Sequence, residues 1–169
     1  HGLGLPAAVS QEDIRRDVYP ATAENPRYSE GSIAALQDGS LLYATTEFIG
    51  GRADHATARI VAKKSTDGGR HWGEARVLQE NTGKQNVMSV TLRRLLPDRA
   101  DGPLGMFYLV KNSPADLQAF LRISRDEAAT FGEPIRVTTA AGYHVMNNDR
   151  VTVLTGGRLV CPVAWTVDI

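Results

Sequence analysis

The sequence contains a single cysteine, Cys161, among 169 residues. One cysteine excludes a disulfide bond within the chain. The four histidines are scattered, so together with that lone thiol they argue against a structural zinc site. The residues therefore predict neither a metal ion nor a cofactor.

The chain also has no excess of positive or negative charge. The chain has 19 Lys and Arg against 19 Asp and Glu, and no basic run exceeds two residues. Nucleic acids and anionic membranes select clustered basic side chains, so we expect neither partner. No apolar run approaches the roughly 18 to 20 residues of a membrane helix, so membrane insertion is not expected either. Helix signals are weak, and residues 1–26 read as a leader segment.

The sequence does contain an internal repeat of strand-like hairpins. Residues 33–43 read as strand, Asp-Gly turn and strand, and residues 151–160 repeat the pattern with a Gly-Gly turn. Between them, residues 90–95 and 104–110 flank a longer turn. The turn glycines Gly39, Gly102 and Gly157 are 63 and 55 residues apart.

A second repeat runs in phase with the first. Residues 65–72 recur as residues 124–131, 59 positions later, and each copy lies between two strand-like runs. Four-stranded antiparallel units at a fixed period are typical of β-propeller blades. The sequence therefore predicts an all-β propeller, with blade one at about 30–80, blade two at about 86–140 and the start of blade three at 143–169.

The repeated segment resembles the Asp-box turn of sialidases, Ser-x-Asp-x-Gly-x-x-Trp. Its Ser and Asp side chains can bind turn amides, its Gly can adopt positive φ, and its aromatic ring can pack beneath the turn. The box therefore indicates fold rather than catalysis. Its structural residues are Ser65, Asp67, Gly69 and Trp72 in the first copy and Ser124, Asp126 and Phe131 in the second, where Ala128 replaces the expected Gly.

An ordered set of polar clusters strengthens this resemblance over about residues 26–165. The clusters are residues 28–31, 50–55, 86–90, 107–113 and 142–150. In this order they resemble a bacterial sialidase-like family of exo-glycosidases. The resemblance implies a six-bladed propeller in the parent protein, of which about two and a half blades are present. It also implies hydrolysis of terminal sialic acid or a related acidic sugar from glycans, in a secreted or periplasmic protein.

Asp54 is the candidate acid/base residue. It lies eleven residues before Ser65, the spacing at which sialidases carry a catalytic loop Asp, and it follows a Gly-rich stretch. General acid chemistry needs a carboxyl group with a raised pKa. The alternative is a solvated loop Asp beside His55.

The remaining polar residues of these clusters are candidates for binding the sugar at the rim of the propeller channel. They are Glu30, Arg52, His55, Asn86, Lys111, Asn112, His144, Asn148, Asp149 and Arg150. Sialidases carry an Arg at the strand that here reads Gly31–Ala34 with Glu30 before it, so Arg52 or Arg150 would have to substitute. The Asn residues could equally be ordinary turn residues, and His144 a structural histidine.

The catalytic Tyr and Glu of sialidases would come from later blades, so the 169-residue chain is expected to be inactive alone and to need the C-terminal blades of the same parent. Two other readings stay open. One is a propeller that binds carbohydrate without cleaving it. The other is a structural or protein-binding Asp-box propeller, in which Asp54, Lys111, Asn148 and Arg150 would not converge.

Overall fold

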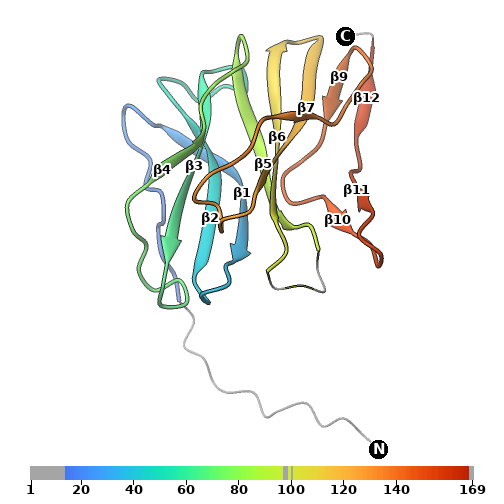
Figure 1. Cartoon of the computed structure of the whole chain (residues 1–169). Coiled ribbons are helices and arrows are strands. Elements are labelled where there is room, and N and C mark those ends of the chain that lie inside the picture. Colours follow the sequence, from blue (N-terminus) through green and yellow to red (C-terminus); the bar gives the residue numbers. More distant parts are fainter. Residues whose placement is uncertain (1–13, 97–98, 100, 168–169) are drawn as a thin grey trace, which may run out of the picture.

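The computed structural model describes residues 14–96, 99 and 101–167, and all regular structure within them is β-strand (Figure 1). No helix occurs in those ranges, and so none that could cross a membrane. The strand pairs of the described part of the chain are antiparallel, except β7 with β9, and they confirm the predicted all-β class.

The first sheet lies at about the residues predicted as blade one. It contains four antiparallel strands in chain order: β1 (Arg27–Ala35), β2 (Leu41–Phe48), β3 (Ala58–Ser65) and β4 (Arg76–Gln79). The β1–β2 hairpin closes on Gly39, whose φ of 79° is a left-handed conformation that suits glycine. Hydrophobic residues alternate along β2, so that Leu42 and Ala44 point to one face and Tyr43 to the other.

The second sheet begins as predicted but extends further. Its strands are β5 (Asn86–Arg94), β6 (Leu104–Ser113), β7 (Asp116–Ser124), β8 (Ile135–Arg136), β9 (Tyr143–Val145) and β12 (Ala164–Thr166). Strand order is β12-β9-β7-β6-β5, with β8 also pairing β7. The short β9 lies parallel to β7, where Tyr143 pairs with Leu117. The second sheet therefore continues past residue 143, the predicted start of blade three.

The predicted third hairpin is present as a separate pair, β10 (Thr152–Val153) and β11 (Leu159–Val160). Gly156 and Gly157 form its turn with φ of 88° and 83°. The described strands do not close into a ring, so the number of blades and their closure stay predictions.

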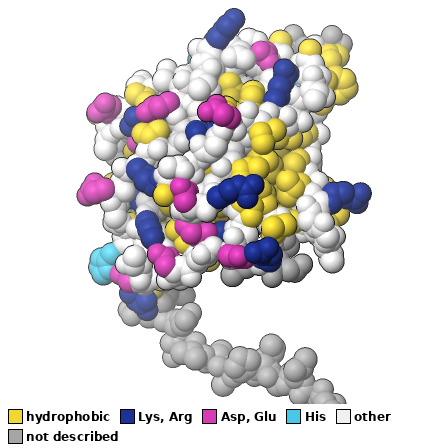
Figure 2. Space-filling model, in the orientation of Figure 1, with side chains coloured by type: hydrophobic (Ala, Val, Ile, Leu, Met, Phe, Trp, Pro, Cys, Tyr) yellow, Lys and Arg dark blue, Asp and Glu magenta, His cyan; other side chains and the backbone are white. Residues whose placement is uncertain are grey.

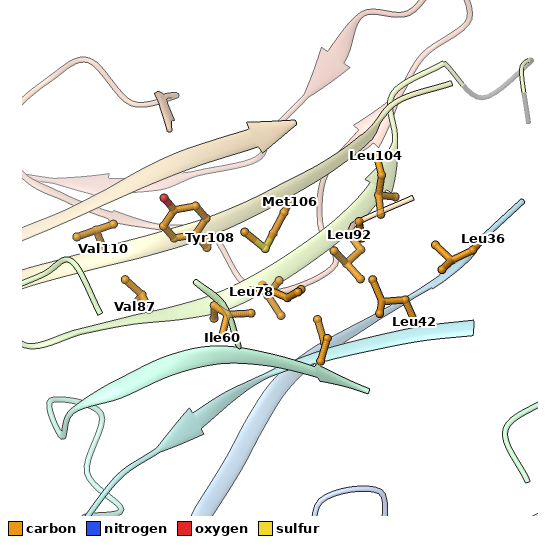
Figure 3. Close-up of a cluster of buried hydrophobic side chains, with 14 residues drawn as sticks. Leu36, Leu42, Ile60, Leu78, Val87, Leu92, Leu104, Met106, Tyr108 and Val110 are labelled. Atoms are coloured by element: carbon orange, nitrogen blue, oxygen red, sulfur yellow. The ribbon is translucent and has the colours of Figure 1, made fainter. Parts of the chain in front are cut away.

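The two sheets pack face to face around a shared hydrophobic core (Figure 3). Leu42 and Ile60 from the first sheet meet Leu92, Met106 and Tyr108 from the second, and each is at most 1% exposed. A second cluster lies on the opposite face of the second sheet and includes Phe107 and Leu109. Strand β6 is therefore buried on both faces, which explains its unbroken apolar run.

Figure 2 shows hydrophobic side chains gathered on the half of the molecule that carries the later strands. Among the described residues, large hydrophobic side chains with more than a third of their surface exposed include Ile135, Val145, Val160, Trp165 and Val167.

A third repeat, which sequence reasoning missed, lies in the backbone. Glu30, Ser89 and Asp149 adopt φ of 60°, 58° and 57°, and they are spaced 59 and 60 residues apart. In β1 and β5 this residue falls within a shift of register, which identifies a β-bulge. The repeat period is therefore built into the strands as well as the turns.

Hydrogen bonds join these bulged regions to one another. The Ser32 hydroxyl donates to Asp149 Oδ1 at 2.9 Å and accepts from the Leu92 amide at 2.9 Å. The Asp149 amide donates to Thr91 Oγ1 at 2.7 Å. Side chains from β1, β5 and the segment before β10 therefore bind one another.

The turn after β3 is held by its own side chains. Ser65 Oγ donates to Asp67 Oδ1 and accepts from the Gly69 amide, each at 2.9 Å. Asp67 Oδ1 accepts from the His71 amide at 2.9 Å, and Trp72 Nε1 donates to the Gly69 carbonyl at 3.1 Å. Gly69 has φ of 89°.

The turn after β7 repeats this arrangement without the glycine. Ser124 Oγ donates to Asp126 Oδ1 and accepts from the Ala128 amide, each at 2.8 Å, and Asp126 Oδ1 accepts from the Thr130 amide at 2.9 Å. Ala128 adopts the left-handed conformation, with φ of 65°, and its side chain is fully buried. Glu127 is also left-handed.

The described part of the leader packs on the face of the first sheet that points away from the core. The Tyr19 ring stacks on Tyr28 with centroids 5.0 Å apart, and Lys63 Nζ donates to the Val18 carbonyl at 2.9 Å. The rest of the predicted leader, residues 1–13, lies outside the described residues.

Candidate functional site

Asp54 lies in the loop between β2 and β3, with its side chain 70% exposed. Arg27, the first residue of β1, donates from Nη1 to Asp54 Oδ1 at 2.5 Å and to the Arg52 carbonyl at 2.8 Å. The Arg27 guanidinium also stacks over the Phe48 ring, 4.3 Å from its centroid. Because Arg27 pairs with Phe48 in the sheet, this register places the guanidinium directly beneath the Asp54 loop.

Two polar residues of the second sheet hold the same loop. Asn86, which is fully buried, donates from Nδ2 to the Asp54 carbonyl at 2.9 Å and to the Ala56 carbonyl at 2.8 Å. Lys111 pairs with Asn86 in the sheet, and its Nζ is 3.4 Å from the Asp54 carbonyl and 5.5 Å from the centroid of the Tyr143 ring. The loop is therefore fixed between the sheets, with cations on two sides.

The electrostatics of Asp54 differ from the expectation for a general acid. The hydrogen bond from Arg27 is the main cause of a lowered pKa for Asp54, and Lys111 and His55 lower the pKa further. A general acid must carry a proton at its working pH. In this geometry Asp54 is an ionised carboxylate, which can accept a proton or stabilise positive charge.

Arg27 is a site residue that sequence reasoning missed. The prediction started the first strand at Gly31, after Glu30, whereas β1 begins at Arg27. An Arg therefore does enter this strand, and its guanidinium reaches the Asp54 loop. The bulge at Glu30 shifts the pairing register between Ser29 and Ser32. Alternation of side chains counted from Gly31 therefore does not continue back to Arg27. Arg52 and Arg150, the predicted substitutes, are exposed.

Glu30 lies in the bulge of β1, and Asn148 and Asp149 lie in the turn between β9 and β10, rather than in the Asp54 loop. Asn148 Nδ2 donates to the Gly31 carbonyl at 2.8 Å, and Asp149 Oδ1 accepts from Arg93 Nη2 at 2.9 Å. Glu30 Oε2 is buried and has no hydrogen-bond partner within the described ranges. Glu30 is in β1, and the other two residues are in the segment 146–150. Within the described residues, no contact joins any of the three to Asp54.

The remaining candidates have other surroundings. His55 is exposed next to Asp54. His144 is buried, its Nδ1 lies 3.0 Å from the Leu117 carbonyl, and its ring stacks on Trp165 at 6.0 Å. Asn112 donates to Asp116 Oδ2 at 2.9 Å, in a separate pocket. Of the predicted rim residues, Asp54, Asn86 and Lys111 converge.

Comparison with solved structures places the chain among proteins of sialidase-like fold. The Hadza microbial sialidase superposes with a TM-score of 0.68 at 17% identity over 84% of this chain, and the Trypanosoma rangeli sialidase in complex with sialic acid with a TM-score of 0.64 at 16% identity over 86%. A protein of unknown function from Dyadobacter fermentans superposes with a TM-score of 0.65 at 15% identity over 84%.

The chain spans 33%, 27% and 47% of these three structures, respectively, which is less than half of each. No protein-family model and no curated protein sequence matches it. At such identities the likeness is one of fold alone.

Proposed function

We propose that this chain is the part of a sialidase-like exo-glycoside hydrolase that contains its acid/base residue. The enzyme would act on terminal sialic acid or a related acidic sugar. The observation that carries the proposal is the grouping of Arg27, Asp54 and Lys111 at one end of two sheets with a sialidase-like fold. Glycans of this kind lie outside the cytoplasm, so secretion or a periplasmic location is part of the proposal.

Arg27 gives the proposed site a way to change the state of Asp54. A guanidinium binds carboxylates in a planar fork, and a carboxylate on the substrate would compete with Asp54 for it. Once Asp54 loses this donor and gains a neighbouring anion, the pKa of Asp54 rises. Substrate binding would thereby prepare Asp54 to protonate the glycosidic oxygen.

Other parts of the proposed site would come from elsewhere in a longer protein. The solved sialidases are three to four times as long as the matched region, at 33% and 27% coverage. We propose that further blades supply the Tyr nucleophile, its Glu partner and the other arginines. The 169-residue chain alone is then inactive.

A second candidate function is carbohydrate binding without hydrolysis. The specific observation in its favour is the lowered pKa of Asp54, which keeps the carboxylate ionised and unsuited to donate a proton. In that case Arg27 and Lys111 would bind an acidic sugar without chemistry.

Turnover of a fluorogenic α-sialoside tests the two candidates. We expect the longer protein that contains this chain to hydrolyse it, and Asp54→Asn to lower kcat by roughly 10²- to 10⁴-fold, the usual contribution of general acid–base catalysis. Asp101→Asn, which removes an exposed carboxylate that pairs with Arg99, is the matched control.

Each outcome assigns one function. Equal turnover by the wild type and Asp54→Asn would remove Asp54 from the mechanism. A wild type inert on sialosides that binds sialylated glycans on an array, with binding lost in Arg27→Gln, would establish the binding function instead.

A further inference from the structure

A pocket of about 390 Å³ opens beside β6 and β7, away from the Asp54 loop. Its floor is a cross-strand aromatic pair: Tyr108 of β6 lies directly opposite Phe120 of β7, with ring centroids 6.0 Å apart and planes inclined by 24°. Phe120 is partly exposed, so its ring surface faces the pocket. The volume is within the range of small-molecule sites, roughly 300 to 1,000 Å³.

The Tyr108 hydroxyl is the unusual feature of this floor. Tyr108 is 1% exposed as a whole residue and lines the pocket, and none of the described residues hydrogen-bonds to its hydroxyl, which is not one of the buried unpaired atoms and so opens onto the pocket. Figure 3 shows this hydroxyl on the side of the ring that points away from Ile60 and Leu78. Burial raises the pKa of Tyr108, so the group is a neutral O–H donor. Because this hydroxyl opens onto the pocket, its donor is free for a molecule bound there.

The wall of the pocket carries a fixed carboxylate. Asp116 accepts from Gln118 Nε2 at 3.0 Å and from Asn112 Nδ2 at 2.9 Å, and these two bonds lower the pKa of Asp116. Gln118 is itself held by the Gly142 carbonyl and Thr138. Each Asp116 oxygen keeps a further lone pair free for an incoming donor, since a carboxylate accepts about four hydrogen bonds.

Arg136 of β8 completes the lining with an exposed guanidinium. The pocket thus combines the apolar ring of Phe120 with the carboxylate acceptor of Asp116. It also contains two donors, the neutral Tyr108 hydroxyl and the cationic Arg136 guanidinium. One face of a pyranose ring presents C–H groups that pack on an aromatic ring, while adjacent hydroxyls on its edge act as both donors and acceptors. An isolated ammonium ion would match Asp116 but would be repelled by Arg136.

We propose that this pocket binds a neutral pyranose unit of a glycan, with the sugar ring on Phe120, adjacent hydroxyls donating to Asp116, and the Tyr108 hydroxyl donating to a sugar oxygen. The site is separate from the Asp54 loop and does not depend on the hydrolase function proposed above. It also gives Asn112 a different role from the one expected from the sequence, because Asn112 orients Asp116.

Titration of the isotope-labelled chain with methyl β-D-galactopyranoside and methyl β-D-glucopyranoside, followed by NMR, tests the site. We expect amide shifts confined to β6, β7, β8 and the loop before β5. Tyr108→Phe should raise Kd about 3- to 10-fold, the value of one neutral hydrogen bond. Asp116→Asn should raise Kd about 10- to 100-fold, because its bonds involve a charged group.

Controls separate this site from general effects. Tyr108→Phe removes only an atom without a protein partner, so its melting temperature should match the wild type even if Asp116→Asn is less stable. Asp101→Asn should bind as the wild type does, and so should Asp54→Asn.

The proposal is overturned if neither pyranoside shifts the pocket amides, if tetramethylammonium shifts them instead, or if Kd is the same in Tyr108→Phe as in the wild type. Hydrolysis of the α-sialoside in the longer protein is an independent readout. Loss of that activity in Asp54→Asn with pyranoside binding retained would support both proposals separately.

Discussion

At the scale of single residues, the pair Arg27 and Asp54 decides the chemistry open to the candidate site. Asp54 is mostly exposed, and an exposed carboxylate without a cation has an ordinary pKa of about 3.9. The 2.5 Å contact with Arg27 lowers the pKa of Asp54. A neighbour 27 positions away in the sequence therefore sets the protonation state of the predicted acid.

Arg27→Gln should return the pKa of Asp54 towards its ordinary value, because the main cause of the shift is lost. The folded-state pKa of Asp54 is depressed, so the pair stabilises the protein above the unfolded-state pKa of about 3.9, and this contribution disappears as pH falls through the folded-state value. The contribution at pH 7 should be small, about 0 to 1 kcal/mol, since the pair is exposed to solvent.

Carbon NMR titration of the Asp54 carboxyl group measures the shift, and urea denaturation at pH 7 and below pH 3 measures its linkage to stability. Arg99→Gln, which removes the partner of Asp101, should leave the Asp54 titration unchanged. An identical Asp54 pKa in the wild type and Arg27→Gln would show that the contact is absent in solution.

At the scale of elements, the turns after β3 and β7 show how one geometry arises from two sequences. Gly68 and Gly69 take positive φ in the first turn, and Glu127 and Ala128 take it in the second. Left-handed backbone costs a residue with a Cβ roughly 1 to 2 kcal/mol. In the second turn, tertiary contacts offset that strain: Arg94 binds both Glu127 oxygens, at 2.6 and 3.0 Å.

Ser65→Ala should destabilise the protein by about 0.5 to 1.5 kcal/mol, because the Gly69 amide would lose its acceptor in a partly buried turn. Ser124→Ala should have a similar effect through the Ala128 amide. Urea denaturation measures both. Ser113→Ala is the control, since that hydroxyl only accepts from the Ala115 amide in an exposed turn, and it should change stability by less than about 0.5 kcal/mol.

Glu127→Ala should lower the free energy of unfolding by about 1.5 to 3 kcal/mol, because its bonds to Arg94 are charge-assisted and their side chains are only 28% and 18% exposed. The Arg94 hydrogen bond lowers the pKa of Glu127. The loss should therefore be largest above the unfolded-state pKa of about 4.3 and fade at lower pH. Arg125→Ala, in the same turn but exposed, should leave stability unchanged; equal losses in both variants would contradict the role of the ion pair.

At the scale of the whole molecule, the two sheets share one core, so we expect them to unfold together. Residues of β2 and β3 fill one side of the core and those of β5 and β6 the other (Figure 3). Trp72 lies at the end of the first sheet and Trp165 on β12 of the second, which gives each sheet its own fluorescent reporter.

Met106→Ala should destabilise the protein by about 2 to 5 kcal/mol, because it opens a cavity at a fully buried position between the sheets. Thermal unfolding followed by circular dichroism and by tryptophan fluorescence should give a single, coincident transition at a lower temperature. Val77→Ala on β4, at a position that is 37% exposed, should change the unfolding temperature little. Separate transitions for the two sheets would refute the shared core.

Much of the fold could be predicted because the relevant signals are local. The Asp-Gly and Gly-Gly turns and the alternation of β2 depend on nearby residues, and the structure contains those hairpins. The left-handed residues Glu30, Ser89 and Asp149 could not be predicted by alternation, since a left-handed residue with a side chain has no composition signal. The bulge at Glu30 hid the start of β1 and with it Arg27. The parallel pairing of β9 with β7 depends on contacts across 26 residues.

The sequence by itself determined the all-β class, the repeating unit, the two serine-and-aspartate turns and the polar character of the Asp54 loop, because hydrophobic alternation and turn residues act within a few positions. Only the tertiary structure decided which polar residues meet. It brought Arg27, Asn86 and Lys111 to Asp54, and it placed Asn112 in a different pocket with Asp116. Register and sheet packing fix those distances, and both arise from long-range pairing that no local pattern encodes.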